Sequence, residues 1–356
     1  MYNNSQPFKQ SGLPHPHRRT VLRAAGLASL GLAASSSLAG ADEDTDEGNG
    51  KASHKEINTC TVIDEPGDYE IVGDISPDGT DRSACVEIRS DGVALHGNDH
   101  TIDGTGLDSC IAIDHGRRGE EESLDPIIED VTVRGAGVGV SSRFSGFNGV
   151  YRNITAREND SGFRFLVGGG QLTNCRIEEN NTGILLLGEQ AVWEMGGEIV
   201  AEKCTIGSNA SHGIWGGSFS RTGIVSSRII ENGIGVGTSP MAYGSTLHSC
   251  HICRNEHYGI EAGSSPGDDP ELWDDPNRDF PFEPSREGTV IAIENYWGAS
   301  NGPSSFGNPN EPFTDPETGR TADGDGDAIS QGLDPGISNV RFDPFSSATF
   351  SNIGST

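Results

Sequence analysis

Cys175-Arg-Ile-Glu-Glu-Asn180-Asn-Thr-Gly183-Ile184 is one copy of a phrase that the chain repeats. Six of the seven copies have an Asn five residues after the first position, as in the copies that begin at Cys204 and Cys250. A repeat of about 20 to 25 residues without a helix-length amphipathic segment is typical of a solenoid, in which each coil buries the apolar face of the next. The first position falls at Val131, Ile154, Cys175, Cys204, Ser227, Cys250 and Val290.

The pattern within each copy predicts strands separated by tight corners. Apolar residues alternate, as in Ile184 and Leu186, which indicates strands with one face inward. Asn tolerates left-handed backbone angles and Gly adopts them freely, so both are expected at the corners, with the Asn side chains hydrogen-bonded from coil to coil. The repeated Asn residues are Asn159, Asn180, Asn209, Asn232, Asn255 and Asn295, and the Gly residues are Gly162, Gly183, Gly213, Gly233 and Gly259.

Six of the seven Cys fall on the same repeat. Cys60, Cys85 and Cys110 share one register, which adds earlier coils and brings the expected total to roughly ten. A second register holds Cys175, Cys204 and Cys250. Stacked side chains in neighbouring coils lie about 4.8 Å apart, which is longer than the Cβ separation a disulfide prefers. The sequence therefore predicts ladders of mostly unpaired, buried thiols.

Two segments resemble a known fold family. The stretch from Val86 to Gly106 is similar to the first coil of right-handed parallel β-helix proteins of the pectin-lyase-like superfamily. Asn295-Tyr-Trp297-Gly298 and the stretch after it resemble the closing coil of secreted members with NosD-like repeats. The resemblance implies an all-β protein, a right-handed single-stranded parallel β-helix over residues 57–346. The same coil carries lyases, hydrolases, epimerases and adhesins, so it does not define a function.

The first 41 residues resemble an export signal. Arg18-Arg19 precedes an uncharged run from Ala24 to Leu38, and Ala39-Gly-Ala41 fits a cleavage site. This is the pattern of a twin-arginine signal peptide, which predicts an extracellular or cell-surface protein with no transmembrane span in the mature chain. Residues 42–56 are predicted to be an acidic disordered linker, and residues 347–356 a C-terminal tail.

The chain is strongly acidic, with 53 acidic against 24 basic residues and a net charge of −29. Such a charge argues against nucleic acid as a partner. It is how proteins remain hydrated in molar salt, and in this respect the chain resembles exported haloarchaeal proteins. An ordinary acidic secreted protein is the alternative.

The insertion at residues 264–288 is the predicted binding element, because insertions into solenoids project on one face and often carry function. Its candidate substrate-binding residues are Trp273, Asp274, Asp275 and Phe280, since aromatic rings stack on sugar faces. Alternatively, these aromatic residues cover a seam of the rod. A second insertion, at residues 115–125, is charged and indicates no function.

Two clusters are candidates for metal binding, although the fold requires no cofactor. Carboxylates at alternate positions of a Gly-rich loop suit calcium, but the loop departs from the EF-hand pattern, and a solvated acidic loop is the alternative. His248-Ser-Cys250-His251-Ile-Cys253 contains soft ligands for copper or zinc. Strand alternation places His248 and Cys250 on one face and His251 and Cys253 on the other. The predicted calcium ligands are Asp323, Asp325, Asp327 and Asp334.

Three functions remain open at the level of sequence. The first is a non-catalytic exported scaffold that binds a polysaccharide or cell-surface glycan along a β-helix face. The second is a polysaccharide lyase or glycoside hydrolase, and the third is a NosD-like copper accessory protein. No catalytic residue is assigned, because the acidic residues are too many to select a pair. Asp99, His100 and Asp103 are interpreted as part of the first coil's structure.

Overall fold

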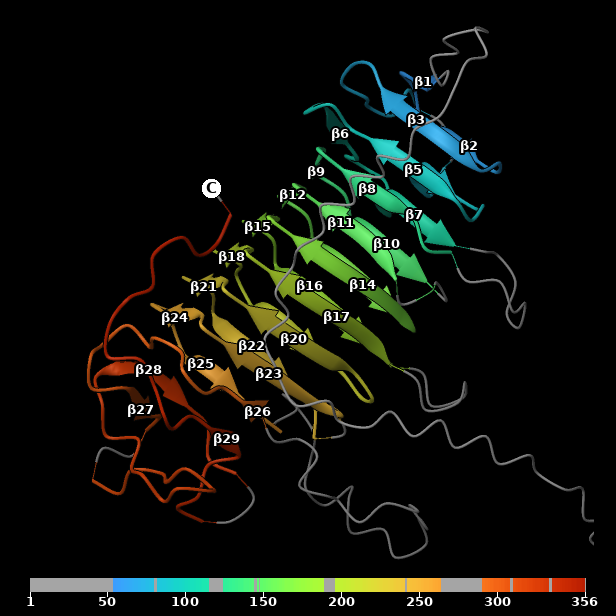
Figure 1. Cartoon of the computed structure of the whole chain (residues 1–356). Coiled ribbons are helices and arrows are strands. Elements are labelled where there is room, and N and C mark those ends of the chain that lie inside the picture. Colours follow the sequence, from blue (N-terminus) through green and yellow to red (C-terminus); the bar gives the residue numbers. More distant parts are fainter. Residues whose placement is uncertain are drawn as a thin grey trace, which may run out of the picture. The chain divides into compact units, whose positions relative to one another are not determined.

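The computed structural model describes residues 54–79, 82–114, 124–143, 146, 148–188, 196–240, 242–263, 290–307, 310–332 and 335–355. Within these ranges every regular element is a β-strand, and all neighbouring strands in the sheets pair in parallel. The strands stack into three sheets, one strand per sheet in each central coil (Figure 1). The fold is the predicted right-handed parallel β-helix. No helix in the described ranges is long and apolar enough to cross a membrane.

Sheets A and B have 11 strands each, and sheet C has seven. Sheet A consists of β1 (Lys55–Ile57), β3 (Gly67–Ile71), β5 (Val93–His96), β8 (Ile127–Glu129), β11 (Gly149–Arg152), β14 (Gly168–Thr173), β17 (Gly197–Glu202), β20 (Arg221–Val225), β23 (Gly244–His248), β26 (Val290–Ile291) and β29 (Val340–Arg341). Sheet B consists of β2 (Thr61–Ile63), β4 (Ala84–Ile88), β7 (Ser109–Asp114), β10 (Val138–Arg143), β13 (Ser161–Leu166), β16 (Thr182–Leu187), β19 (His212–Gly216), β22 (Ile234–Thr238), β25 (Tyr258–Glu261), β28 (Gly326–Ile329) and β27 (Pro303–Ser305). Sheet C consists of β6 (Thr101–Asp103), β9 (Thr132–Arg134), β12 (Thr155–Arg157), β15 (Arg176–Glu178), β18 (Thr205–Gly207), β21 (Arg228–Ile230) and β24 (His251–Cys253).

The core is a column of inward side chains that runs through the stack. Strand alternation places Ile177, Ile206 and Ile229 of sheet C above one another, all completely buried. An aromatic layer forms where the ring of Tyr151 lies 5.8 Å from that of Phe163. The buried Trp297 lies at the C-terminal end of this core. The core thus holds the coils in register and leaves alternate side chains of each strand on the surface.

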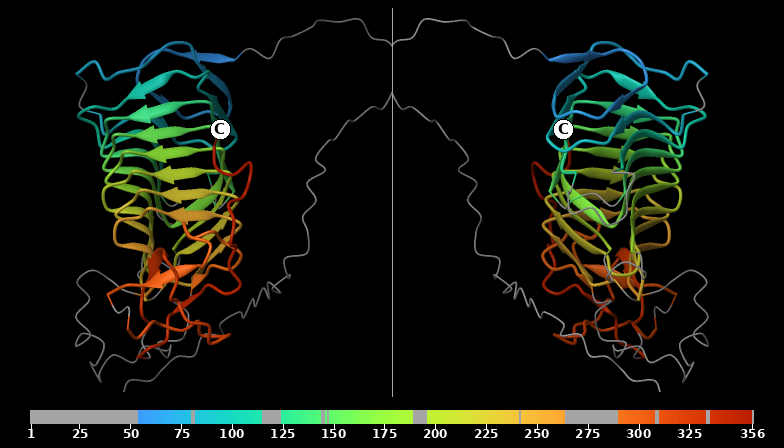
Figure 2. Two further views of the ribbon diagram at one scale, coloured as in Figure 1. Left: turned by 90° about the vertical axis from the view of Figure 1, so that its left-hand side faces the viewer. Right: turned by 90° about the vertical axis from the view of Figure 1, so that its right-hand side faces the viewer.

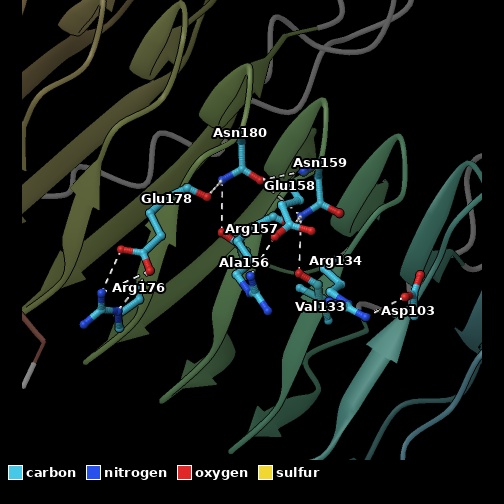
Figure 3. Close-up of polar contacts among 10 residues, drawn as sticks. All are labelled: Asp103, Val133, Arg134, Ala156, Arg157, Glu158, Asn159, Arg176, Glu178 and Asn180. Atoms are coloured by element: carbon cyan, nitrogen blue, oxygen red, sulfur yellow. Dashed lines mark hydrogen bonds and ion pairs between the residues drawn. The ribbon is translucent and has the colours of Figure 1, made fainter.

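A ladder of five Asn side chains connects the coils at the corner between sheets C and B. The Asn159 Nδ2 donates to the Asn180 Oδ1 at 3.1 Å (Figure 3). The Asn180 Nδ2 in turn donates to the Asn209 Oδ1 at 3.1 Å. The same bond continues through Asn232 to Asn255. The predicted ladder is therefore confirmed over these five residues.

The predicted sixth residue, Asn295, is not in this ladder. Its Oδ1 accepts a hydrogen bond from the Cys250 backbone N–H at 2.8 Å, so it occupies the register of the cysteines. The prediction was wrong because Val290 pairs with Ser245 of β23 and not with Cys250. Asp327 takes the place of the sixth Asn, since its Oδ2 accepts from the Asn255 Nδ2 at 2.7 Å.

The corner geometry also differs from the prediction. The left-handed residue is the one that precedes each ladder Asn, as at Glu158 and Glu179, both with φ of 58°. The Gly residues of the repeat have no positive φ; a Cβ at Gly162 would lie 2.7 Å from the carbonyl oxygen of Gly183 in the next coil. Gly is required there for close approach. In the coil of Asn232 that position belongs to Gly235, not to the predicted Gly233.

The cysteines occupy the two predicted registers, but one pair is bonded. Cys60 and Cys85 form a disulfide, which corrects the expectation of unpaired thiols at this end of the stack. Their Cα atoms lie 4.4 Å apart, closer than the spacing assumed for parallel side chains. The free thiols of the described chain are those of Cys110, Cys175, Cys204, Cys250 and Cys253.

The C-terminal segment packs along sheet C. Figure 2 shows it, in red, running back along the stacked coils. The Phe350 N–H donates to the His251 Nε2 at 2.8 Å, and the Ser355 N–H donates to the Thr205 Oγ1 at 3.1 Å. The segment therefore covers the outward positions of β24, β21 and β18, and leaves β6 to β15 of the same sheet open.

Candidate functional site

The predicted binding element cannot be located in the structure. Trp273, Asp274, Asp275 and Phe280 all lie in residues 264–289, outside the described residues. Their role in substrate binding stays a prediction.

The predicted calcium ligands do not converge in the described part of the chain. Asp327 is the terminal residue of the Asn ladder, and its two oxygens accept hydrogen bonds from the backbone N–H groups of Arg254 and Asn255. Asp323 and Asp325 are exposed, whereas Asp334 lies outside the described residues. Within the described ranges no three His, Cys, Asp or Glu residues are placed to hold a metal ion. Because Asp334 is not described, the calcium site stays a prediction.

The His and Cys side chains of residues 248–253 point in three different directions. His248 faces outward on sheet A, where its Nε2 lies 2.8 Å from the Glu294 Oε2, whereas Cys250 is completely buried. The prediction that these two share a face was wrong, because a corner at Ser249, with φ of 55°, separates them. His251 and Cys253 both face outward on sheet C, as predicted.

The open part of sheet C carries ion pairs among its own residues (Figure 3). The Arg134 Nη2 lies 2.9 Å from the Asp103 Oδ2 of the preceding coil, which supports the structural interpretation of Asp103. Hydrogen bonds from Thr105 are the main reason that the pKa of Asp103 is lowered. Two further Arg of this face also have carboxylate partners, since Arg157 pairs with Glu158 and Arg176 with Glu178. This surface therefore offers little uncompensated charge to a ligand.

Sheet B differs from the rest of this acidic chain. The strands β13, β16, β19 and β22 contain no Asp or Glu, and Arg164 is their one charged residue. Their outward residues form two columns along the stack. We call these columns, with Tyr258 of β25 at one end, the platform: Arg164, Leu185, Trp215 and Gly237 in one, and Ser161, Thr182, His212, Ile234 and Tyr258 in the other.

The Trp215 ring lies across the strand of the next coil. A Cβ at Gly237 would lie 2.7 Å from the Trp215 Cε3 and 2.8 Å from the His212 Cδ2, so only Gly leaves room for the two rings. The centroids of these rings are 4.9 Å apart in an edge-on arrangement. Burial lowers the pKa of His212, so its ring is held neutral. The indole therefore presents a flat, partly exposed surface, and its position is fixed by Gly237 beneath the ring and by His212 beside it.

Arg164 supplies the charge of the platform. Its Nη2 donates to the Ser141 Oγ at 3.3 Å, and no carboxylate of the described chain lies within ion-pair distance of it. Burial lowers its pKa; the nearby charge of Asp108 opposes that effect, whereas Arg143 adds to it. A half-buried guanidinium next to a second one is unfavourable unless an anion is close. Arg164 is therefore poised to accept an anionic group.

A second aromatic pair lies two coils beyond Trp215. The ring centroids of Tyr258 and Phe306 are 4.4 Å apart, and Phe306 is 46% exposed. Burial raises the pKa of Tyr258, with a further contribution from Glu261, so its hydroxyl stays protonated. Strands in a sheet are about 4.8 Å apart, so Arg164, Trp215 and Tyr258 recur roughly every 10 Å along the rod.

The sequence interpretation missed the platform, although the sequence contains a signal for it. Trp215 follows the inward Ile214 and so must face outward by strand alternation. A Gly falls at the matching position of the next coil, Gly237, which leaves space for a ring. The absence of acidic residues from four consecutive strands of sheet B was also visible once the strands were aligned.

Two solved structures match: the A-module of mannuronan C-5 epimerase AlgE4 from Azotobacter vinelandii and tailspike protein 2 of the Escherichia coli O157:H7 bacteriophage CAB120. The first is 15% identical with a TM-score of 0.36, over 59% of this chain and 70% of that one. The second is 14% identical with a TM-score of 0.42, over 81% of this chain and 37% of that one. Both similarities concern the fold alone.

A search of curated proteins finds no match. Residues 85–268, just over half of the chain, match the family described as right handed beta helix region. The matched range includes the strands of the platform and the Asn ladder. The chain therefore belongs to this family of right-handed β-helix proteins.

Proposed function

We propose that the protein is exported and binds an acidic glycan along sheet B, without cleaving it. The observation that carries the proposal is the platform: a fixed indole and a guanidinium without a carboxylate partner in the described chain, on four strands that contain no carboxylate. The remaining surface of so acidic a chain repels a polyanion, so a polyanion can approach closely only where acidic residues are missing.

Three platform residues have separate roles in this proposal. The Trp215 face stacks on the apolar face of a sugar ring. The Arg164 guanidinium binds a carboxylate or sulfate through charge-assisted hydrogen bonds. The pair of Tyr258 and Phe306 extends the contact along the rod, so that a polymer lies parallel to the rod axis. A polymer that crossed the coils would meet these groups one at a time.

Retention on immobilised glycans tests the proposal. Purified protein is passed over an acidic and a neutral polysaccharide of matched length at constant salt. Trp215→Ala is expected to weaken retention on the acidic polymer by about 2 kcal/mol, roughly thirtyfold, because stacking aromatic residues dominate such interfaces. Arg164→Gln is expected to weaken retention on the acidic polymer and to leave retention on the neutral one unchanged.

Val200→Ala is the matched control, since Val200 is 47% exposed on sheet A, away from the platform. It should bind as the wild-type protein does. Equal retention of the Trp215→Ala and Val200→Ala variants, both folded by circular dichroism, would refute the proposal. Shortening of the polymer during the assay would instead support the lyase or hydrolase alternative.

A further inference from the structure

A second site lies at the C-terminal end of sheet C, apart from the platform. A cavity of about 440 Å³ lies there. Its walls come from β21, β24, the start of β28, residues 296–298 and Thr349 of the C-terminal segment. The polar side chains that matter most to its chemistry are Arg228, Arg254, His251, Trp297, Asp325 and Asp327.

Two N–H donors of these residues are buried without an acceptor. They are the Arg228 Nε and the Trp297 Nε1, and the Trp297 side chain is completely buried. No carboxylate in the described ranges lies within ion-pair distance of Arg228, whereas Arg254 pairs with Glu231 at 2.7 Å. Buried donors without partners are rare in folded proteins and often mark a bound water or ion.

The acceptors of the cavity, by contrast, already have donors. The Asp327 oxygens accept from the N–H groups of Arg254 and Asn255, and Asp325 accepts from the Asn301 Nδ2. The His251 Nε2 accepts from the Phe350 N–H. The site therefore has two buried donors without acceptors and a positive charge without a partner in the described ranges, whereas each of these three acceptor side chains already accepts at least one hydrogen bond. A ligand that supplies only acceptors and negative charge complements it.

The C-terminal segment lies along one side of this site. The Phe350 ring stacks on His251 with centroids 5.8 Å apart. Gly354 lies against the aliphatic part of Arg228, and its N–H donates to the Ser226 carbonyl at 3.0 Å. Where water is excluded, as around the buried Arg228 Nε, the attraction between a guanidinium and an anion is stronger.

We propose that this cavity binds a small oxyanion, such as phosphate or sulfate, with Arg228 as its anchor and the Trp297 indole N–H as a second donor. Arg is suited to this role because its planar group presents several donors to one anion. The ligand is a single small ion, not a polymer, because the C-terminal segment covers the outward side of β21 and β24.

Isothermal titration calorimetry of phosphate and of sulfate into the full chain, at constant chloride and ionic strength, tests the proposal. Saturable binding of at least one of the two ions at a single site is expected. Arg228→Gln should weaken it by at least about tenfold, the factor that corresponds to 1.4 kcal/mol. Arg157→Gln is the control, because Arg157 is on the same sheet but pairs with Glu158, and it should leave binding unchanged.

A spectroscopic measurement keeps the proposal testable if Arg228→Gln fails to fold. The indole N–H resonance of Trp297 in the wild-type protein should shift on titration with the same ion, as a donor that gains an acceptor does. No saturable heat and no shift of this resonance would overturn the proposal. Equal weakening by the Arg228→Gln and Arg157→Gln variants would also overturn it, because the effect would then be one of net charge.

Discussion

Replacement of Asn209 by Leu tests the ladder at its central residue. The Asn209 Oδ1 accepts from both the backbone N–H and the Nδ2 of Asn180, each at 3.1 Å. Its own Nδ2 donates to the Ile177 carbonyl at 3.1 Å and to the Asn232 Oδ1 at 2.9 Å. Asn209 is 1% exposed, so water cannot replace these bonds. Leu has a similar size and shape but none of the polar atoms.

The expected loss follows from the groups that remain without partners. The Asn180 Nδ2 still donates to the carbonyls of Ala156 and Glu178, so it stays satisfied. The Asn180 backbone N–H and the Ile177 carbonyl each lose a partner in a buried setting. An unsatisfied buried group costs about 1–3 kcal/mol. Because the carbonyl has a second lone pair, we expect Asn209→Leu to lower the free energy of unfolding by about 2–4 kcal/mol.

Urea unfolding in a fixed high-salt buffer, followed by circular dichroism, measures this difference. Gln171→Leu is the control, since it also replaces an amide by Leu but at an exposed position of sheet A. Its effect should stay within about 0.5 kcal/mol. If the two variants lose the same free energy, the ladder does not stabilise the fold through its buried hydrogen bonds, and the reasoning is wrong.

Three further predictions concern pH, the disulfide and salt. Burial raises the pKa of Asp327 above its usual 3.8, although hydrogen bonds from Asn255 oppose this rise. The contribution of Asp327 to the free energy of unfolding is therefore fully present below pH 3.8. It is lost as the pH rises through the raised pKa. Melts of the wild type and of Asp327→Asn across the acidic range should diverge accordingly, and parallel curves would contradict the shift. Reduction of the Cys60–Cys85 disulfide, which closes a loop with a sequence separation of 25, should lower stability by about 3 kcal/mol in urea unfolding; no change on reduction would show that the bond is absent or strained. The net charge of −29 should lower the melting temperature as salt falls from 1 M to 0.1 M, where the screening length grows from about 3 Å to 10 Å, and a constant melting temperature would remove the argument from charge.

The repeat was sufficient to predict the fold and most of the ladder, because one phrase recurs from Asn159 to Asn255 at separations of 21, 29, 23 and 23 residues. It failed at Asn295, where residues 264–288 interrupt the interval and spacing no longer determines which positions face each other. The role of Asp327 was missed for a related reason. A carboxylate can end a ladder of amides by accepting the hydrogen bond of the last amide. Which residue does so depends on the coil that follows in space, and Asp327 is 72 residues from Asn255 in the sequence.

The candidate sites were harder to predict because they depend on what lies beside a residue in neighbouring coils. Trp273 was selected because its insertion contains several aromatic and acidic residues. Trp215 was not selected, although Gly237 in the next coil leaves space for its ring and so holds the indole in a fixed position. Arg164 and Arg157 look alike in sequence. In the structure Arg157 has a carboxylate at 2.7 Å, whereas Arg164 has none within ion-pair distance in the described chain.

The ladder and the platform are connected through the coils that carry both. Asn209 lies between β18 and β19, and β19 carries Trp215; Asn232 lies between β21 and β22, and β22 carries Gly237. Hydrogen bonds between these Asn residues hold the corner from which both strands of sheet B begin, so they fix the height of the indole above the next strand. A surface whose groups are already in place loses little conformational freedom when a ligand binds. A stiff solenoid can therefore bind a flexible polymer along its length, because the ordering on binding is confined to the polymer.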